Sequence, residues 1–303
     1  PALAVVSQSG AMASVVRAAL EARDMPVALT VSTGNEAVNG AEDFIEHLIE
    51  QDHTKAIAIV AEQIRQPRRF LELAARARAK GKPIVLLHPG RSSAAQQSAI
   101  THTGAMTGDW QVMRTLVTHA GVALVETMDE LIDVAEMLVR FPHLPTRGSI
   151  VLGESGAFKA MMLDLAETVG LDLPAPEGAS YAMLDSLAPG LILPTNPVDL
   201  TAQPLVDPQL YTKALPTLAN DPRYGSLVVG MIMTSPAFTH RKATPILEAL
   251  KEIAAPKPVV FAMLGEDAPV AADVIAAFRE RGIPFIRSPD RVIRALATVT
   301  RQG

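Results

Sequence analysis

The chain has 303 residues, of which 49% are hydrophobic and 19% charged, a composition that excludes an intrinsically disordered protein and suits two domains. Its net charge of −5 offers no basic surface to nucleic acid, and no apolar run approaches the roughly 20 residues that cross a bilayer. The absence of cysteine excludes disulfides, thiol catalysis and thiolate metal sites, and the first residues do not resemble a secretory signal, so we expect a cytoplasmic protein.

Short β-branched runs alternate with helical patterns through the first half of the chain. This alternation is typical of a parallel sheet covered by helices on both faces. We therefore predict a flavodoxin-like, doubly wound α/β domain over residues 1–143. Its expected strands are Leu3–Ser7, Val27–Ser32, Ala56–Ala61, Pro83–His88 and Val122–Val125, and a helix is expected over Pro67–Lys80.

A segment with two prolines and a glycine follows, and we place the linker at residues 144–147. The same alternation restarts beyond it, which predicts a second flavodoxin-like, doubly wound domain over residues 148–303. The proline-rich region from Pro174 to Pro208 is expected to be a shaped, ordered loop with one short helix, Ser180–Leu187. The other expected elements are strands at Ser149–Gly153, Ser226–Met233, Pro258–Met263 and Pro284–Ile286, and a helix from Gly156 to Val169.

Each half opens with a strand, a turn that contains Ser-Gly, and a helix. The turns Ser9-Gly10 and Ser155-Gly156 expose backbone N–H groups at the positive end of a helix, where we expect a phosphate or sulfate ion to bind. Each turn by itself is better explained by serine as an ordinary N-cap and glycine as a tight-turn residue, and only the two matching turns together give the anion site equal weight. Neither turn carries a dinucleotide or P-loop fingerprint, so they do not by themselves predict a nucleotide site.

A histidine and a carboxylate are the other candidates. His102 follows the strand that ends at His88, in a polar stretch that we predict to be a loop. An imidazole there can reach a ligand, although taken alone it is more often a plain surface group. Glu62 ends an apolar strand, where ligands of open sheets collect, and can orient an imidazole; a helix cap or a solvated residue is the alternative. No histidine pair has metal-ligand spacing, so no metal site is expected.

One chemistry uses these features together: a histidine that accepts a phosphoryl group, steadied by a carboxylate and by two helix N-termini. The motifs also resemble the ADP-forming acyl-CoA synthetases of the succinyl-CoA synthetase superfamily, over nearly the whole chain, as their two central domains. The motifs are Ser7-Gln8-Ser9-Gly10, Thr33-Gly34-Asn35-Glu36, Glu62, Gly90-Arg91-Ser92, Thr101-His102-Thr103-Gly104-Ala105, Gly153-Glu154-Ser155-Gly156 and Asn196-Pro197-Val198-Asp199-Leu200.

The resemblance implies a reversible ligase in which acyl-CoA and phosphate give an acyl phosphate, a histidine takes the phosphoryl group, and ADP receives it. It implies that His102 is the phosphorylated residue and that Glu62 steadies the imidazole. The Ser9-Gly10 and Ser155-Gly156 turns would hold the phosphoryl group. The supporting loops would contain Gly34, Asn35, Thr103, Gly104 and Asn196.

Such an enzyme also needs a CoA-binding domain and an ATP-grasp domain. We expect both elsewhere in a longer protein or on partner subunits, where CoA, ATP or ADP and Mg²⁺ would bind, and we expect no tightly bound cofactor in this chain. A small carboxylic acid and phosphate are the expected substrates, a homo-oligomer is compatible with the sequence, and neither nucleic acid nor a membrane is expected as a partner.

Two other readings remain open. In one, the chain is a regulatory, sensory module such as those fused to lysine acetyltransferase domains, in which the histidine is replaced; the presence of His102 argues against it. In the other, it is a plain flavodoxin-shaped binding module, which would need no matched pair of phosphate turns.

Overall fold

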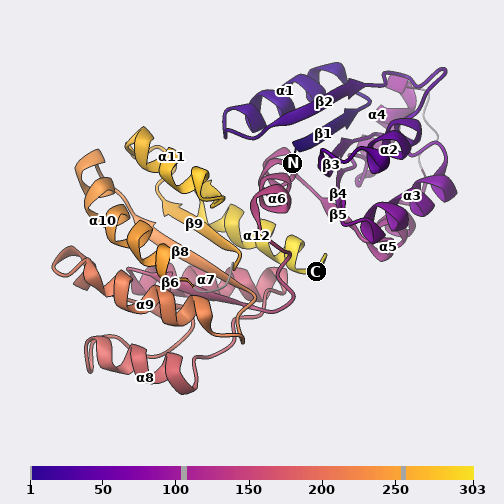
Figure 1. Ribbon diagram of the computed structural model, residues 1–303. Coiled ribbons are helices and arrows are strands. Elements are labelled where there is room, and N and C mark those ends of the chain that lie inside the picture. Colours follow the sequence, from indigo (N-terminus) through magenta and orange to yellow (C-terminus); the bar gives the residue numbers. More distant parts are fainter. Residues whose placement is uncertain (1, 104–107, 254–256) are drawn as a thin grey trace. The chain divides into compact units, whose positions relative to one another are not determined.

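The structure, a computed structural model, describes residues 2–103, 108–253 and 257–303, without the side chains of 99–103 and 252. The chain divides into two compact units, Pro1–Val139 and Arg140–Arg301, each built on its own five-stranded parallel sheet (Figure 1). Within the described residues, no helix has the length and apolar character that crossing a membrane requires.

The first unit is an α/β layer structure with the strand order β2-β1-β3-β4-β5, which is the flavodoxin-like order. Its strands are β1 (Ala2–Ser7), β2 (Val27–Ser32), β3 (Thr54–Val60), β4 (Ile84–Leu87) and β5 (Val122–Val125). Its helices are α1 (Gly10–Glu21), α2 (Ala41–Glu50), α3 (Pro67–Ala79), α4 (Ser93–Thr103), α5 (Trp110–His119) and α6 (Met128–Arg140).

Helices on both faces explain why the central strands are almost continuously apolar. Val6 of β1 lies beside Ile59 of β3, and both side chains pack into one core with α2, α3 and α5. On α6, the buried carboxylates of Asp133 and Glu136 pair with Arg23, which follows α1, at 2.7 and 2.8 Å. These ion pairs join the end of α1 to α6.

The second unit repeats the topology. Its order, β10-β9-β8-β6-β7, is again second, first, third, fourth and fifth strand when read from the other edge. Its strands are β6 (Ser149–Gly153), β7 (Val198–Asp199), β8 (Ser226–Ile232), β9 (Val259–Leu264) and β10 (Phe285–Ile286). Its helices are α7 (Gly156–Val169), α8 (Gly178–Leu187), α9 (Gln209–Asn220), α10 (Pro236–Ala249), α11 (Ala272–Glu280) and α12 (Pro289–Thr300), with short 3₁₀ turns at Gln203–Leu205 and Leu250–Glu252.

Glycines on two neighbouring strands let α7 approach this sheet closely. The ring of Phe158 lies over Gly153 of β6 and Gly230 of β8, and a Cβ atom at either glycine would lie 2.3 Å from the ring. On the other face, α8, α9, α10 and α11 pack against the sheet in a separate apolar core. The matched layouts of the two units confirm the prediction of two doubly wound sheets.

Two expectations about local structure are wrong. His102 lies in helix α4, not in a loop, because Ser92 caps that helix by accepting the N–H of Ala95 at 3.1 Å and the following residues are good helix formers. The proline-rich region also contains a strand, β7, and is not only a loop with a helix. Helix α8 begins at Gly178, two residues before the predicted start.

Candidate functional site

The candidate site of the first unit lies where its strand order reverses, between β1 and β3, which is where open α/β sheets bind ligands. Gln8, which follows β1, joins the two strand ends. Its Nε2 donates to the carbonyl of Gln63 at 2.7 Å, and its Oε1 accepts the N–H groups of Glu62 and Gln63 at 2.7 and 3.0 Å. These bonds hold the loop that carries Glu62 beside the start of α1.

The Ser9-Gly10 turn opens α1 with a well-defined cap. The Ser9 Oγ accepts the N–H of Met12 at 3.4 Å, and the Ser7 hydroxyl accepts the N–H of Ser9 at 3.1 Å while donating to its carbonyl at 2.8 Å. The first N–H groups of the helix proper, from Gly10 onward, have no acceptor within the helix. They are the donors that an anion at this turn would use.

A cavity of about 260 Å³ lies over this turn. Arg65 lies at its wall, because its guanidinium donates to the backbone carbonyls of Asn35, at 3.3 Å, and of Glu36. The Glu36 carboxylate is buried; its Oε1 accepts from Thr33 and from the N–H of Ala41 at 3.1 and 2.9 Å, and its Oε2 has no hydrogen-bond partner among the residues that the structure describes. The lining residues are Gln8, Ser9, Gly10, Gly34, Asn35, Glu36, Glu62, Gln63 and Arg65.

The structure thus brings five predicted site residues to one cavity: Ser9, Gly10, Gly34, Asn35 and Glu62. A helix N-terminus, a guanidinium and side-chain amides around one hollow suit a phosphoryl group. Glu62 is half-buried and is not the cap of α3, whose N-cap residue is Gln66. Sequence reasoning assigned no role to Gln8 or Arg65, and the position of Gln8 inside the Ser-Gln-Ser-Gly turn was the only signal for either.

His88, at the end of β4, lies near Glu62. Burial lowers the pKa of His88, while its contact with the Ala61 backbone and the negative charge of Glu62 act in the opposite direction. Because burial is the largest of these effects, the pKa of His88 is lowered and the neutral imidazole is favoured. His88 is therefore a half-buried imidazole beside the candidate site, whereas the sequence predicted only that it ends a strand.

The predicted phosphorylated residue is located by its backbone only. His102 and Thr103 lie in the last turn of α4, their side chains are outside the described part of the structure, and Gly104 is wholly outside it. Contact between the His102 imidazole and Glu62 therefore stays a prediction.

In the second unit, the Ser155-Gly156 turn opens α7 at the matching place, after β6. A carboxylate already lies beside it: a Cβ atom on Gly156 would lie 3.4 Å from Asp199 Oδ2. The negative charge of a carboxylate is stabilised by the partial positive charge at the N-terminus of α7. Anion binding at this turn stays a prediction, and an incoming anion would have to share the helix end with Asp199.

A buried ionic cluster lies directly before this turn. Glu154 accepts from Lys242 Nζ at 2.6 Å, from the Ile232 N–H at 3.2 Å and from the Tyr211 hydroxyl. Lys242 and Glu154 expose only 5% of their side chains, and Lys242 also donates to the carbonyl of Ile232 at 2.8 Å. Burial, together with the Glu154 charge, raises the pKa of Tyr211 well above its ordinary value. The cluster joins β6 to β8 where the strand order of this sheet reverses.

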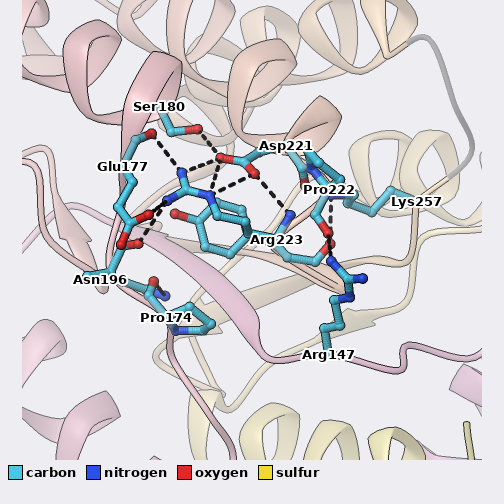
Figure 2. Close-up of polar contacts among 11 residues, drawn as sticks. Arg147, Pro174, Glu177, Ser180, Asn196, Asp221, Pro222, Arg223 and Lys257 are labelled. Carbon is cyan, nitrogen blue, oxygen red and sulfur yellow. Dashed lines mark hydrogen bonds and ion pairs between the residues drawn. The ribbon is translucent and has the colours of Figure 1, made fainter.

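Asn196, predicted as a supporting residue, binds backbone. Its Oδ1 accepts the Val151 N–H at 3.0 Å, and its Nδ2 donates to the carbonyls of Ser149 and Pro174 at 2.7 and 2.9 Å. Figure 2 shows this amide beside Pro174. The side chain fastens the proline-rich region to β6, and both of its N–H groups are used in doing so. Among the residues with described side chains, no group of three or more histidines and carboxylates is placed to hold a metal ion.

Comparison with known proteins gives a consistent set of relatives. Residues 1–138 match the succinyl-CoA ligase like flavodoxin domain. A trans-feruloyl-CoA synthase from an unknown prokaryotic organism is 42% identical over 98% of this chain and 42% of its own length. The ADP-forming acetate–CoA ligase I subunit alpha of Pyrococcus furiosus is 29% identical over 98% of this chain and 63% of its own. The chain therefore spans about half the length of the curated relatives it matches.

The fold recurs in solved structures. The dinucleotide forming acetyl-coenzyme A synthetase 1 of Ca. Korarchaeum cryptofilum, in complex with phosphate and ADP, matches with a TM-score of 0.88 at 22% identity. The match covers 99% of this chain and 64% of that one. It supports the fold of both units.

Proposed function

We propose that the chain belongs to the ADP-forming acyl-CoA synthetases and is the central, phosphoryl-carrying part of an acid–CoA ligase, because residues 1–138 match the succinyl-CoA ligase like flavodoxin domain and its relatives are named as an acyl-CoA synthase and an ADP-forming CoA ligase subunit. The observation that carries this proposal is the cavity of the first unit, which combines the α1 N-terminus, Glu62 and Arg65 at one sheet edge. A CoA-binding domain and an ATP-grasp domain would act with it.

In the proposed reaction, phosphate displaces CoA from an acyl-CoA and gives an acyl phosphate. A nitrogen of the His102 imidazole then attacks the phosphorus and the carboxylic acid leaves. ADP finally takes the phosphoryl group from the histidine, which restores the imidazole and gives ATP. Glu62 would favour the positive charge that develops on the ring, and the α1 N-terminus would hold the phosphoryl oxygens.

Phosphorylation of His102 tests this function directly. The complete enzyme that contains this chain is incubated with radiolabelled ATP, and acid-labile label on the protein is counted. We expect His102→Asn to lose all label and Glu62→Gln to keep a reduced amount, because the amide preserves shape but removes the charge that stabilises the imidazolium. His119→Asn, at the end of α5, is the matched control and should label like the wild type.

Melting curves of each variant establish that it is folded. Label that persists in a folded His102→Asn protein would show that another residue carries the phosphoryl group. If even the complete wild-type protein never takes up label, the ligase function fails and the regulatory reading becomes the better one.

The identity of the acid is a separate question. The 42% identical relative is named for an aromatic acyl-CoA and the Pyrococcus relative for acetate. Aromatic acids and acetate are therefore the two classes to compare.

A further inference from the structure

The first unit contains a second cavity, of about 210 Å³, that is mainly apolar. It lies between α3 and α5, at the carboxyl end of β4. Aromatic and aliphatic side chains form most of its wall, whereas Glu62, Gln63 and His88 lie where it meets the strand ends. The principal apolar lining residues are Phe70 and Leu71 on α3, and Trp110, Met113, Leu116 and Val117 on α5.

This apolar cavity adjoins the polar cavity over the Ser9-Gly10 turn. Glu62 and Gln63 line both of them. A molecule with an anionic end in the polar cavity and an apolar body would therefore find room for that body on the other side of the same two residues. An acyl phosphate has this character, since a phosphate group and an acyl group lie on opposite sides of one carbonyl carbon.

We propose that the apolar cavity is the acyl subsite and that it takes the ring of an aromatic acyl group, while the polar cavity takes the phosphoryl end. The proposal rests on the function proposed above and adds the substrate class. It assigns Trp110, Met113 and Phe70 to substrate recognition.

The size of the cavity selects for a ring. A dry apolar cavity of about 150 Å³ holds one benzene molecule. A cavity of about 210 Å³ therefore has room for a ring and a short connecting arm. The methyl group of acetate would leave most of the lining without contacts, and the lost dispersion and burial would weaken its binding.

Two buried polar atoms of the lining residues also indicate that the apolar cavity takes a ligand. Trp110 Nε1 and His88 Nδ1 are buried and have no hydrogen-bond partner among the residues that the structure describes. Buried polar atoms are nearly always paired in folded proteins, so each unpaired one requires an explanation. A ligand in the cavity that both residues line is such an explanation.

Trp110 provides the experiment, because it is the only tryptophan of the chain. The chain is titrated with 3-phenylpropanamide or with acetamide, two neutral probes that avoid repulsion from Glu62 and differ in the ring-bearing arm. We expect a saturable change in tryptophan emission with 3-phenylpropanamide and none with acetamide, with excitation at the red edge, where the phenyl ring does not absorb.

A matched pair of variants locates the binding. Met113 and Met183 are both partly buried methionines packed against the core of their own unit, but only Met113 lines the cavity. Met113→Ala should weaken binding of 3-phenylpropanamide at least about fivefold, through lost apolar contact, and Met183→Ala should not change it. If Met113→Ala does not fold, the exposed helix leucines Leu116 and Leu163 give a second pair as Leu116→Ala and Leu163→Ala.

Equal emission changes with the two probes, no change with either, or equal affinities in a folded cavity variant and its control would each overturn the acyl subsite. His102→Asn separates this outcome from the fate of the proposed function, since it should bind 3-phenylpropanamide normally and yet take no label in the complete enzyme. Ring binding without any labelling of the wild type would disprove the ligase function and leave an aromatic-ligand pocket.

Discussion

The Gln8 side chain makes three hydrogen bonds to the loop after β3, and these bonds set the position of Glu62. Neither the Glu62 N–H nor the Gln63 N–H lies in a helix or strand, so the side-chain oxygen of Gln8 is the acceptor that a backbone carbonyl provides in regular secondary structure. A single residue therefore links the Ser9-Gly10 turn to the carboxylate proposed to steady the phosphohistidine. Gln8 acts through Glu62 and is a positioning residue.

We expect Gln8→Ala to lower the free energy of unfolding by about 1–3 kcal/mol, because two backbone N–H groups lose their acceptor. It should also reduce phosphorylation of the complete enzyme, since Glu62 loses its anchor, whereas Gln8→Glu keeps an acceptor oxygen and should recover part of the stability. Urea unfolding and label uptake measure the two effects. Gln111→Ala, exposed on α5, is the control, and a Gln8→Ala protein as stable and as well labelled as that control would contradict the assignment.

At the scale of elements, the sequence predicts the helices and strands that have a repeating apolar pattern. β2, β5, β6 and α7 have the predicted bounds, because β-branched runs and the 3.6-residue apolar period are strong local signals. Helix α4 lacks such a period, since its described side chains are largely exposed, and its Ser-Ala-Gln composition resembles a loop. Strand β7 is only two residues long and lies between prolines, so no pattern marks it.

The candidate site was predictable only in part, because some of its contacts join residues that are far apart in the sequence. Ser9-Gly10 and Glu62 follow strands of a parallel sheet, and the carboxyl ends of such strands share one edge, so their meeting follows from topology. The contacts of Gln8 with Gln63 and of Glu154 with Lys242 join residues 55 and 88 positions apart. No local pattern carries that information, and only the folded chain reveals these pairs.

The turn between α9 and β8 contains a carboxylate, Asp221, whose stabilising contacts depend on its charge and so on pH. Figure 2 shows Arg223 folded back on Asp221, with Ser180 and Lys257 around them. Burial by itself would raise the pKa of Asp221, but hydrogen bonds from Arg223 and Ser180 prevail and lower it from 3.8 to about 2. Ser180 Oγ donates to the Asp221 carboxylate at 2.6 Å, and Lys257 Nζ donates to the backbone carbonyl of Asp221 at 2.6 Å.

A carboxyl whose pKa is lowered by folding stabilises the protein at a pH above its pKa in the unfolded chain, here 3.8. This contribution is lost as the pH falls toward the folded-state pKa of about 2. We expect Asp221→Asn to melt below the wild type at pH 5 and above, and the difference to shrink between about pH 4 and pH 2. Melting curves over this range measure it, with the exposed Asp185→Asn as control. A difference that stays constant with pH would show that the Asp221 charge is not what stabilises the turn.

At the scale of the whole molecule, one topology carries two kinds of polar site. In the first unit, the reversal of strand order leaves a cavity bordered by Glu62 and Arg65. In the second, the corresponding strands β6 and β8 are joined by the buried pair of Glu154 and Lys242. The buried pair joins β6 to β8, so we assign strand cohesion to the Glu154 cluster, whereas anion binding at the neighbouring Ser155-Gly156 turn stays a prediction.

Each unit also has its own optical reporter, so the two can be followed separately. The only tryptophan, Trp110, lies in the first unit, and the three tyrosines, Tyr181, Tyr211 and Tyr224, all lie in the second. Lys242→Met leaves the Glu154 carboxylate buried without its cation, which typically costs about 3–5 kcal/mol. For a domain of this size the expected fall in melting temperature is roughly 6–20 °C.

We therefore expect the Lys242→Met protein to show a lowered transition in second-derivative tyrosine absorbance and an unchanged transition in tryptophan emission. Adding Glu154→Gln should restore part of the tyrosine-reported midpoint, because the buried charge is then gone and the amide can still accept from Tyr211. Arg65→Met, in the first unit, is the matched control, and it should leave the tyrosine-reported transition in place. If the tryptophan and tyrosine transitions of Lys242→Met fall together, the two units unfold as one cooperative body and their separate cores do not set their stabilities.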